Sequence, residues 1–366
     1  MNPPILKKRK IGILIGSIIT GAGGAEKQAV LLSGVLASCH EVRFIVLNGN
    51  KISPRLHKQL SEQQSTHSFL KGSLFARLHQ LISYLKDDKP DILFCYLTSS
   101  NFIGGILGKV LRIPYVIGGI RSSKMERLKL IIQRFTHNHL TRYTIFNNYR
   151  GSDSFTDIGF NPLKIRTIPN GIEVEEEFYR RKEKNHLHII TVGRFVEAKD
   201  FKTALHSIQL LTGDLPETIG IKYLLVGFGE LEDQIRVWIG QLHLENHVQI
   251  VHNPSNLKEI YQQADIYLCT SYFEGLSNSI LEAMNYGLPI VGTNVGDNSH
   301  LILDNKTGYL TRPYDHPGIA EKLKELVLNY PKRISYGEKG FEHCRENYSI
   351  ERFTSNYLTF IDSLIA

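Results

Sequence analysis

The sequence predicts an α/β protein built from two doubly wound parallel sheets. Short runs rich in Val, Ile and Leu alternate with helical patterns along the whole chain of 366 residues. The runs are continuously apolar, which is typical of strands buried on both faces, and the helices between them imply parallel strands with right-handed crossovers. A charged stretch with few apolar residues, 173–186, separates two such series and marks a boundary between domains.

Each half has its own series of expected strands. The first half contains "IGILIGSI", "VRFIVLN", "DILFCYL", "YVIGGI", "YTIFNN" and "KIRTIPN", and the second contains "LHIITVG", "IKYLLVG", "HVQIVH", "DIYLCT" and "PIVGTNV". We therefore expect domains at 1–168 and 169–349, and an amphipathic C-terminal helix within 350–366 that packs back on them. Ligands of such folds bind at the carboxyl ends of the strands, so we expect the site in a cleft between the domains.

The composition is that of an ordinary folded protein, with 42% hydrophobic and 22% charged residues. No apolar run reaches the roughly 18 to 20 residues that a membrane-spanning helix requires. The four cysteines are isolated and lack the paired spacing of a zinc or redox motif; they are Cys39, Cys95, Cys269 and Cys344. We expect them to be reduced, in a cytoplasmic protein.

The charge is divided unequally between the halves. Residues 1–168 carry 24 Lys and Arg against 9 Asp and Glu, whereas the remainder carries 19 against 27. The first half has no zinc spacing, RNP-like motif or helix-turn-helix signal, which favours an anionic membrane or a phosphorylated acceptor over nucleic acid. The alternative is a basic surface that is simply solvated.

A Gly-rich turn follows the first expected strand in "GSIITGAGGAEKQAV", residues 16–30. With the basic residues before it, the segment imitates a secretory signal, but cleavage there would remove a strand of the first sheet. A dinucleotide fingerprint would need a glycine at the position of Glu26, and the second strand ends in "LNGN" without an acidic residue. We expect Gly23 and Gly24 to form a turn before a helix whose amides bind an anion; a turn without a ligand is the alternative.

Two cations follow the first strand of the second half. That strand ends at Gly193, and Arg194 and Lys199 come directly after it in "TVGRFVEAKDF". Such a pair suits a diphosphate, because Arg offers a planar fork of donors and Lys a mobile point charge. The alternative is a pair of solvated surface cations.

The stretch "SYFEGLSNSILEAM", residues 271–284, follows another buried strand. It predicts a turn at Gly275 and then a helix capped by Ser277 or Asn278. Glu274 lies before this cap and Glu282 about one turn inside the helix. Carboxylates accept hydrogen bonds from sugar or ribose hydroxyls, and the helix N-terminus attracts phosphate. The alternative for Glu282 is an ordinary exposed helical glutamate.

The glycines of "YLLVGFGELED" follow a third strand of the second half. Gly227 and Gly229 would let a base or ribose lie against the backbone. A Gly-x-Gly pair alone is a weak signal.

Taken in order, "GAGGAEK", "IPNGIE", "VGRFVEAKDF", "LLVGFGELE", "FEGLSNSILEAM" and "PIVGTNVGDNSHLILDNKTGYL" resemble family 4 of the retaining glycosyltransferases. The resemblance covers almost the whole chain. It implies the GT-B fold, in which two Rossmann-like domains face each other across a ligand cleft.

The resemblance also implies roles for individual residues. Arg194 and Lys199 would hold the donor diphosphate, Glu274 the donor sugar, and Glu282 the ribose. Gly23 and Gly24 would lie near the donor phosphates. The remaining donor contacts implied are Gly193, Gly227, Gly275, Leu276 and Ser277.

At one position the sequence departs from the family pattern. Many members place a histidine after the fourth strand of the first domain, near the transferred sugar, and here "YVIGGIRSS" places Arg121 there. We expect Arg121 to contact the sugar or the acceptor.

The resulting prediction is a retaining, metal-independent hexosyltransferase with Arg194, Lys199 and Glu274 as catalytic residues. The donor would be a nucleoside diphosphate sugar, UDP-sugar favoured over GDP-sugar, and the acceptor a hydroxyl of a glycan or lipid-linked molecule in bacterial-type cell-surface polysaccharide synthesis. No cofactor, metal or nucleic acid is expected. The rival functions are a two-lobed nucleotide-sugar binding protein without chemistry, and a sugar-nucleotide epimerase or phosphorylase of the same fold.

A basic amphipathic helix is expected over 122–135, "SSKMERLKLIIQRF". Ser123 and Glu126 form a capping-box pattern. The apolar residues at helical spacing are Met125, Leu128, Ile131, Ile132 and Phe135, and the basic residues around them are Lys124, Arg127, Lys129 and Arg134. Such a helix can lie in an anionic membrane interface, which would place the protein in the cytoplasm and peripherally on the inner face of the plasma membrane. The alternative is an ordinary helix that faces the core.

Overall fold

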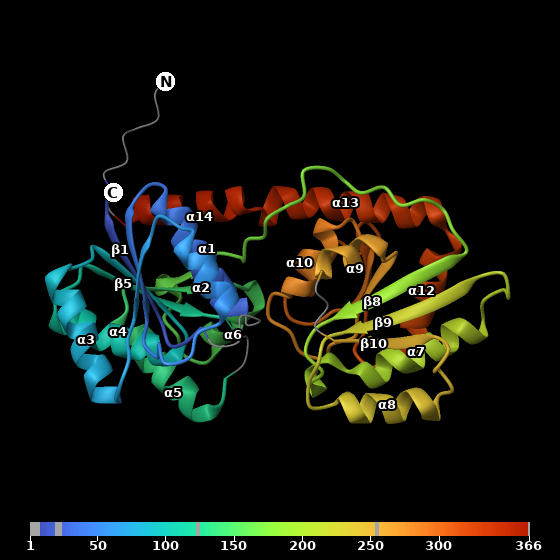
Figure 1. Ribbon diagram of the computed structural model, residues 1–366, viewed down its shortest axis with the longest axis horizontal. Coiled ribbons are helices and arrows are strands. Elements are labelled where there is room, and N and C mark those ends of the chain that lie inside the picture. Colours follow the sequence, from blue (N-terminus) through green and yellow to red (C-terminus); the bar gives the residue numbers. More distant parts are fainter. Residues whose placement is uncertain (1–7, 19–23, 122–124, 253–255, 365–366) are drawn as a thin grey trace, which may run out of the picture. The chain divides into compact units, whose positions relative to one another are not determined.

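The computed structural model describes residues 8–18, 24–121, 125–252 and 256–364. The chain divides into two compact units: Met1–Gly171 with Glu351–Ala366 form unit 1, and Ile172–Ile350 form unit 2. Figure 1 shows a twisted sheet with helices on both faces in each unit. The predicted α/β class and the parallel sheets are confirmed, since every strand pairing within the two sheets is parallel.

Unit 1 contains a seven-stranded sheet in its described part, with the order β3-β2-β1-β4-β5-β6-β7. Its strands are β1 (Lys10–Ile15), β2 (Glu41–Val46), β3 (Thr66–Phe69), β4 (Ile92–Tyr96), β5 (Tyr115–Ile120), β6 (Tyr143–Phe146) and β7 (Ile165–Thr167). Its helices are α1 (Gly24–Ala37), α2 (Pro54–Ser61), α3 (Leu74–Asp87), α4 (Thr98–Val110), α5 (Arg127–Phe135), the π-helix η1 (Thr136–Leu140), α6 (Tyr149–Asp157), the short η2 (Pro162–Lys164) and α14 (Ile350–Ser363).

The two faces of this sheet explain the continuous apolar runs. In β1, Ile13 and Ile15 point into a core cluster shared with α1, α2 and α14, whereas Leu14 points into a second cluster on the other face. Because alternate side chains of a strand leave opposite faces, a strand covered on both sides needs apolar residues at every position. β1 pairs with β2 and β4, so the apolar run that imitates a signal peptide forms an interior strand.

Unit 2 contains a six-stranded sheet in its described part, with the order β10-β9-β8-β11-β12-β13. Its strands are β8 (His186–Val192), β9 (Gly220–Val226), β10 (Val248–Val251), β11 (Ile266–Cys269), β12 (Ile290–Thr293) and β13 (Gly308–Thr311). Its helices are the short η3 (Glu197–Lys199), α7 (Phe201–Gly213), α8 (Glu232–Gln241), α9 (Leu257–Gln263), α10 (Asn278–Asn285), α11 (Asn298–Leu301), α12 (His316–Leu328) and α13 (Tyr330–Tyr348).

The expected boundary stretch is anchored to unit 2 by a buried arginine. The Arg181 side chain is only 6% exposed. Its guanidinium donates to the carbonyl oxygens of Ala264, Tyr261, Tyr286 and Gly287, in addition to that of Tyr179. Burial lowers the pKa of Arg181 to about 10, so it remains charged at neutral pH. The charged composition of 173–186 therefore does not mark a free linker along its whole length.

Helix α14 belongs to the core of unit 1, although it follows unit 2 in the sequence. Phe353, Tyr357 and Phe360 are buried against residues of β1, β4 and α1. The Phe353 side chain lies over Gly171, where a Cβ would come within 2.6 Å of Phe353 Cβ and 2.8 Å of its ring. The amphipathic pattern expected at the C-terminus thus buries its apolar face on unit 1.

Candidate functional site

The first part of the site is the loop that follows β8 in unit 2. The Gly193 amide donates a hydrogen bond to the carbonyl oxygen of Val226 in β9. Arg194 follows it with an exposed side chain. The chain then forms η3, which ends at Lys199. A Cβ on Gly193 would lie 3.3 Å from Lys199 Cε, so the glycine gives the lysine room to return across the loop. The two cations predicted from the sequence thus leave the same strand end.

Lys199 forms a largely buried ion pair with Glu274. Its Nζ lies 2.5 Å from Glu274 Oε1, and the two side chains are 19% and 13% exposed. Ser271 Oγ also donates to Glu274 Oε1, at 2.8 Å. Burial alone would lower the pKa of Lys199, but the Glu274 carboxylate outweighs it and the pKa is raised. The structure therefore brings two predicted catalytic residues together with the lysine firmly charged, and Arg194 close enough to repel it.

The backbone holds the Glu274 loop in place from two sides. Tyr272 N donates to Ala198 O at 3.0 Å, and Asp297 N donates to Gly275 O at 3.1 Å. Gly296 has a φ of +52°, and a Cβ there would overlap the carbonyl oxygen of Glu274. This contact explains the glycine in the "NVGD" stretch after β12, because no other residue fits so close to the loop.

Helix α10 begins directly after this loop. Ser277 occupies the N-cap position without a capping hydrogen bond from its side chain, and both Leu276 and Ser277 are buried. The amides of the first turn of α10 therefore lie next to the Lys199–Glu274 pair, which is the arrangement that binds anions at helix N-termini.

Glu282 is fixed by a tyrosine that the sequence reasoning missed. Tyr261, from α9, is 1% exposed and donates its hydroxyl to Glu282 Oε2 at 2.9 Å. The Tyr261 ring stacks on Tyr286, with centroids 5.3 Å apart. Glu282 is half-buried, which excludes the alternative of a freely solvated helical glutamate. No short motif links α9 to α10, so only the fold could identify this partner.

The Gly-x-Gly pair after β9 packs against protein. A Cβ on Gly227 would overlap the Gly193 carbonyl oxygen, and one on Gly229 would come within 2.5 Å of Phe195 O. The two glycines thus allow the loops after β8 and β9 to touch. The close approach of the two loops is by itself a reason for glycine at both positions, with or without a base or ribose against the backbone. A donor contact of Gly227 stays a prediction.

Two exposed tyrosines at the same edge of the sheet were also missed. Tyr272 follows β11 and Tyr314 follows β13, and they are 37% and 61% exposed. Their rings stack with centroids 5.8 Å apart, and Tyr314 has a φ of +66°. Exposed aromatic faces at a ligand-binding edge can stack on planar or sugar rings.

Of the three residues predicted for the site in unit 1, the structure describes Gly24 and Arg121. Gly24 begins α1, the helix after β1, and Gly23 lies outside the described residues. Arg121 follows β5, and its guanidinium lies 4.7 Å from the Tyr96 ring centroid and donates to Tyr357 Oη and Asn170 Oδ1. These contacts favour a role in joining α14 to the sheet; a contact with sugar or acceptor stays a prediction.

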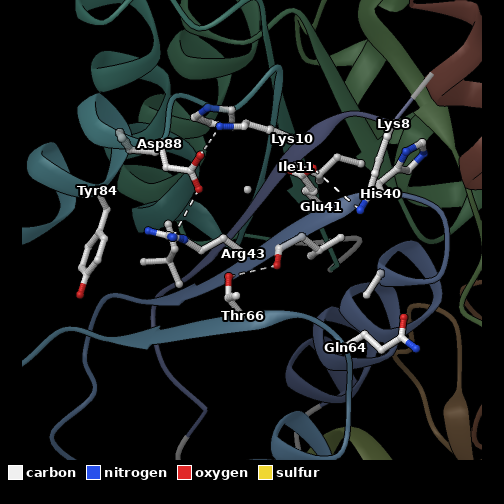
Figure 2. Close-up of a pocket in the computed structure, with 16 residues that line it drawn as sticks. Lys8, Lys10, Ile11, His40, Glu41, Arg43, Gln64, Thr66, Tyr84 and Asp88 are labelled. Carbon is white, nitrogen blue, oxygen red and sulfur yellow. Dashed lines mark hydrogen bonds and ion pairs between the residues drawn. The ribbon is translucent and has the colours of Figure 1, made fainter.

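Unit 1 also holds a cavity of about 270 Å³ at the amino ends of its strands (Figure 2). Asp88 accepts from Lys10 Nζ at 2.7 Å and lies 3.3 Å from an Arg43 nitrogen, and Arg43 lies over the Tyr84 ring. The cavity is thus lined by groups that compensate one another. Because ligands of α/β sheets bind at the opposite, carboxyl edge, we assign this cavity no part in the reaction.

Within the described residues, no three His, Cys, Asp or Glu side chains gather as a metal site. No helix in the same part of the chain is long and apolar enough to span a membrane. All four cysteines are unpaired.

The chain matches two family models in succession. Residues 22–176 match the model described as Glycosyltransferase Family 4, and residues 174–343 match the one described as Glycosyl transferases group 1. A relative from Bacillus anthracis, N-acetyl-alpha-D-glucosaminyl L-malate synthase, is 31% identical over 96% of both chains. An Escherichia coli relative, UDP-Gal:alpha-D-GlcNAc-diphosphoundecaprenol alpha-1,3-galactosyltransferase, is 24% identical over 70% of this chain and 72% of its own.

Solved structures are more similar to this chain in fold than in sequence. Anabaena Alr3699/HepE, crystallised with UDP, superposes with a TM-score of 0.82 at 16% identity, over 97% of this chain and all of its own. The sucrose-phosphate synthase of Thermosynechococcus elongatus gives 0.75 at 17% identity, over 98% and 99% of the two chains. The matched models, the B. anthracis relative and the parallel sheets agree, and the chain belongs to family 4 of the glycosyltransferases, with the GT-B fold.

Proposed function

We propose that the protein transfers a hexose, with retention of configuration and without a divalent metal, from a UDP-sugar to a hydroxyl of a glycan or lipid-linked acceptor in cell-surface polysaccharide synthesis. A GDP-sugar is the second choice of donor. The observation that carries this proposal is the cluster at the carboxyl edge of the unit 2 sheet, where Arg194, the Lys199–Glu274 pair and the N-terminus of α10 lie on adjoining loops. UDP in the crystals of Alr3699/HepE supports the choice of base.

The cluster suits a departing diphosphate. In the transfer, the anomeric C–O bond to the diphosphate breaks, and its electron pair leaves negative charge on the phosphate oxygen. Arg194, Lys199 and the α10 amides would stabilise that charge as it develops. The new bond forms between the anomeric carbon and the acceptor oxygen on the same face, and the acceptor's proton passes to the departing phosphate. No side chain of the protein is required as nucleophile.

The two glutamates have different tasks in this proposal. Glu274 lies in the loop beside Lys199 and would accept hydrogen bonds from the hydroxyls of the donor sugar. Glu282 lies within α10, held by Tyr261, and would accept both ribose hydroxyls. A ribose contact is equally strong before and during bond breaking, so it contributes to donor binding and not to the rate of the chemical step.

The cluster also counts against one rival function, the binding protein without chemistry. A binding protein needs affinity for its ligand but has no need of groups that stabilise charge appearing only as a bond breaks. An epimerase of this fold would share the diphosphate contacts, and a phosphorylase would need cations for its phosphate, so both rivals are separated only by their products.

One observation favours a different acceptor. The B. anthracis relative, which aligns over 96% of this chain, is named for the synthesis of N-acetyl-alpha-D-glucosaminyl L-malate, whereas the E. coli relative is named for a diphosphoundecaprenol-linked GlcNAc. A small hydroxy acid is therefore the second candidate acceptor.

The test is nucleoside diphosphate release from UDP- and GDP-sugars by the purified full chain, with a GlcNAc-diphospho-lipid, a short glycan, L-malate or no acceptor. A transferase releases the diphosphate in an acceptor-dependent manner, yields a glycoside of the donor's anomeric configuration and tolerates EDTA. Thermal stabilisation by UDP without release would support the binding protein. A changed sugar without a glycoside would support the epimerase, and sugar phosphate formed with added phosphate would support the phosphorylase.

A further inference from the structure

Helix α5 exposes the apolar residues that a core-facing helix would bury. Leu128, Ile131 and Phe135 are 71%, 51% and 50% exposed. They are three and four residues apart, so they lie on one face of the helix. The expected helix 122–135 begins at Arg127 in the structure, while Ser123 and Lys124 lie outside the described residues.

The opposite face of α5 packs against the core of unit 1. Gln133 is fully buried and accepts from Asn101 of α4 at 3.0 Å. Leu130 packs against the cluster that contains Phe146 and Phe155. Because a separate face already holds the helix on unit 1, the exposed apolar row is not required for that packing.

A loop next to the end of α5 carries further exposed apolar side chains. Arg134 donates to the carbonyl oxygen of Ile158 at 3.0 Å, and Asn138 donates to that of Gly159 at 3.0 Å. The segment after α6 therefore runs along the end of α5. It carries two more exposed apolar side chains, Ile158 at 40% and Leu163 at 80%. We call these five apolar residues the α5 surface: Leu128, Ile131, Phe135, Ile158 and Leu163.

Basic residues predominate around the surface. Arg127, Lys129 and Arg134 are all exposed on α5. Two acidic residues lie beside them: Glu126, which pairs with Lys129 at 3.1 Å, and the exposed Asp157, which precedes Ile158. Residues 1–168 as a whole carry 24 basic against 9 acidic side chains. An apolar row within a basic field complements a surface that offers negative headgroups over a hydrocarbon layer.

We propose that the α5 surface docks unit 1 on an anionic lipid bilayer, with α5 lying in the interface and Leu128, Ile131 and Phe135 inserted among the acyl chains. The inference deepens the proposed function and rests on it for its purpose, because a docked enzyme meets a lipid-linked acceptor in two dimensions. The docking itself requires no catalysis.

The test is co-sedimentation of the full chain with vesicles of phosphatidylcholine and phosphatidylglycerol at 7:3, at low and high salt. Docking predicts binding at low salt that weakens at least about 10-fold in high salt or with pure phosphatidylcholine, since charge attraction is screened. The variant Leu128→Gln/Ile131→Gln/Phe135→Gln should lose about 10-fold or more in partition. Arg127→Gln/Lys129→Gln should bind more weakly and respond less to salt.

The matched control replaces three side chains of similar exposure in unit 2. Leu210, Val237 and Leu328 are 44%, 50% and 49% exposed, and their joint change to Gln should leave vesicle binding as in the parent. Circular dichroism and gel filtration of each variant check the fold and the oligomeric state.

Three results would overturn docking: no binding of the parent to the anionic vesicles, parental binding by the α5 triple variant, or loss of a parental dimer in that variant, which would mean that a second copy covers the face. Diphosphate release with a soluble acceptor is measured in parallel. A protein that docks but shows no release contradicts the proposed function alone, and one that releases diphosphate but does not dock contradicts this inference alone.

Discussion

A lysine held 2.5 Å from a carboxylate oxygen can exchange that partner for another anion of comparable charge. Glu274 raises the pKa of Lys199, so the lysine stays protonated although it is largely buried. When a diphosphate arrives, the ammonium can contact it while the carboxylate turns to the sugar hydroxyls. Arg194, which is exposed, needs no such exchange.

The hydrogen bond from Tyr261 to Glu282 leads to a prediction about donor binding. Glu282→Ala should raise the KM for the donor about 10-fold or more and change kcat little, since a ribose contact is made equally in the ground and transition states. Tyr261→Phe removes only the hydroxyl that positions Glu282, and a smaller rise in KM is expected. Steady-state kinetics over donor concentration measure both. A fall in kcat at unchanged KM in either variant would contradict the assignment.

At the scale of whole elements, replacing Arg181 should greatly lower the stability of unit 2. Arg181→Met would leave several buried carbonyl oxygens without donors, at a cost of about 3 kcal/mol or more in the free energy of unfolding. Trp238, the single tryptophan, packs against the core of unit 2, so urea titration followed by its fluorescence reports on that unit. The exposed neighbour gives the control, Arg180→Met, which should be near neutral. Equal midpoints for the two variants would refute the role.

A buried histidine in the π-helix η1 predicts that unit 1 loses stability as the pH falls. His137 is fully buried, with Nδ1 2.8 Å from Thr144 Oγ1 and Nε2 3.0 Å from the Asn161 carbonyl oxygen. Burial lowers the pKa of His137 to about 4 from its ordinary value of 6.5. Between these values the unfolded chain binds a proton that the folded chain does not, so stability falls as the pH drops from about 6.5 towards 4, by at most about 1.4 kcal/mol per pH unit.

Hydrogen exchange of the amides in β6 across this range measures the effect. His137→Gln should be less stable than the parent at pH 7.5 but should show a shallower loss between pH 6.5 and 4.5. The exposed His79→Gln serves as the control and should follow the parent. A His137→Gln profile as steep as the parent's would assign the acid lability to other groups.

The elements found by sequence reasoning were those whose burial leaves a mark on composition. β1 and β11 are covered on both faces and read as continuous apolar runs. Of the four edge strands, β7 and β10 were predicted and β3 and β13 were missed: β3 reads "THSF" with two exposed residues, and β13 reads "GYLT". Each has four residues and one neighbour in its sheet, so neither needs a long apolar run.

The residues of the candidate site also divide into those that the sequence predicted and those that it did not. Arg194, Lys199, Glu274 and Glu282 were found because each follows a recognisable strand or turn. Tyr261 was not, because its partner Glu282 lies 21 residues away and only the folded chain brings the two together. The α5 surface lies between these cases. Periodicity predicted the helix, but a core helix has the same periodicity, and only the exposure of its apolar side chains in the structure distinguishes the two.

For the whole molecule, the account requires that one exposed guanidinium in unit 2 controls the chemistry without supporting the fold. Arg194→Ala removes a charge-assisted contact that strengthens as the donor bond breaks, which typically costs on the order of 100-fold or more in turnover. The melting temperature should stay within about 1 °C of the parent, because exposed cations contribute little to stability.

The most direct measurement is therefore acceptor-dependent release of UDP from the donor by Arg194→Ala and by the parent, with the two melting curves recorded beside it. The account predicts a variant that melts with the parent and turns over at least about 100-fold more slowly. An Arg194→Ala protein that melts normally and releases UDP at the parental rate would contradict the leaving-group role of this cluster, and with it the proposed transfer mechanism.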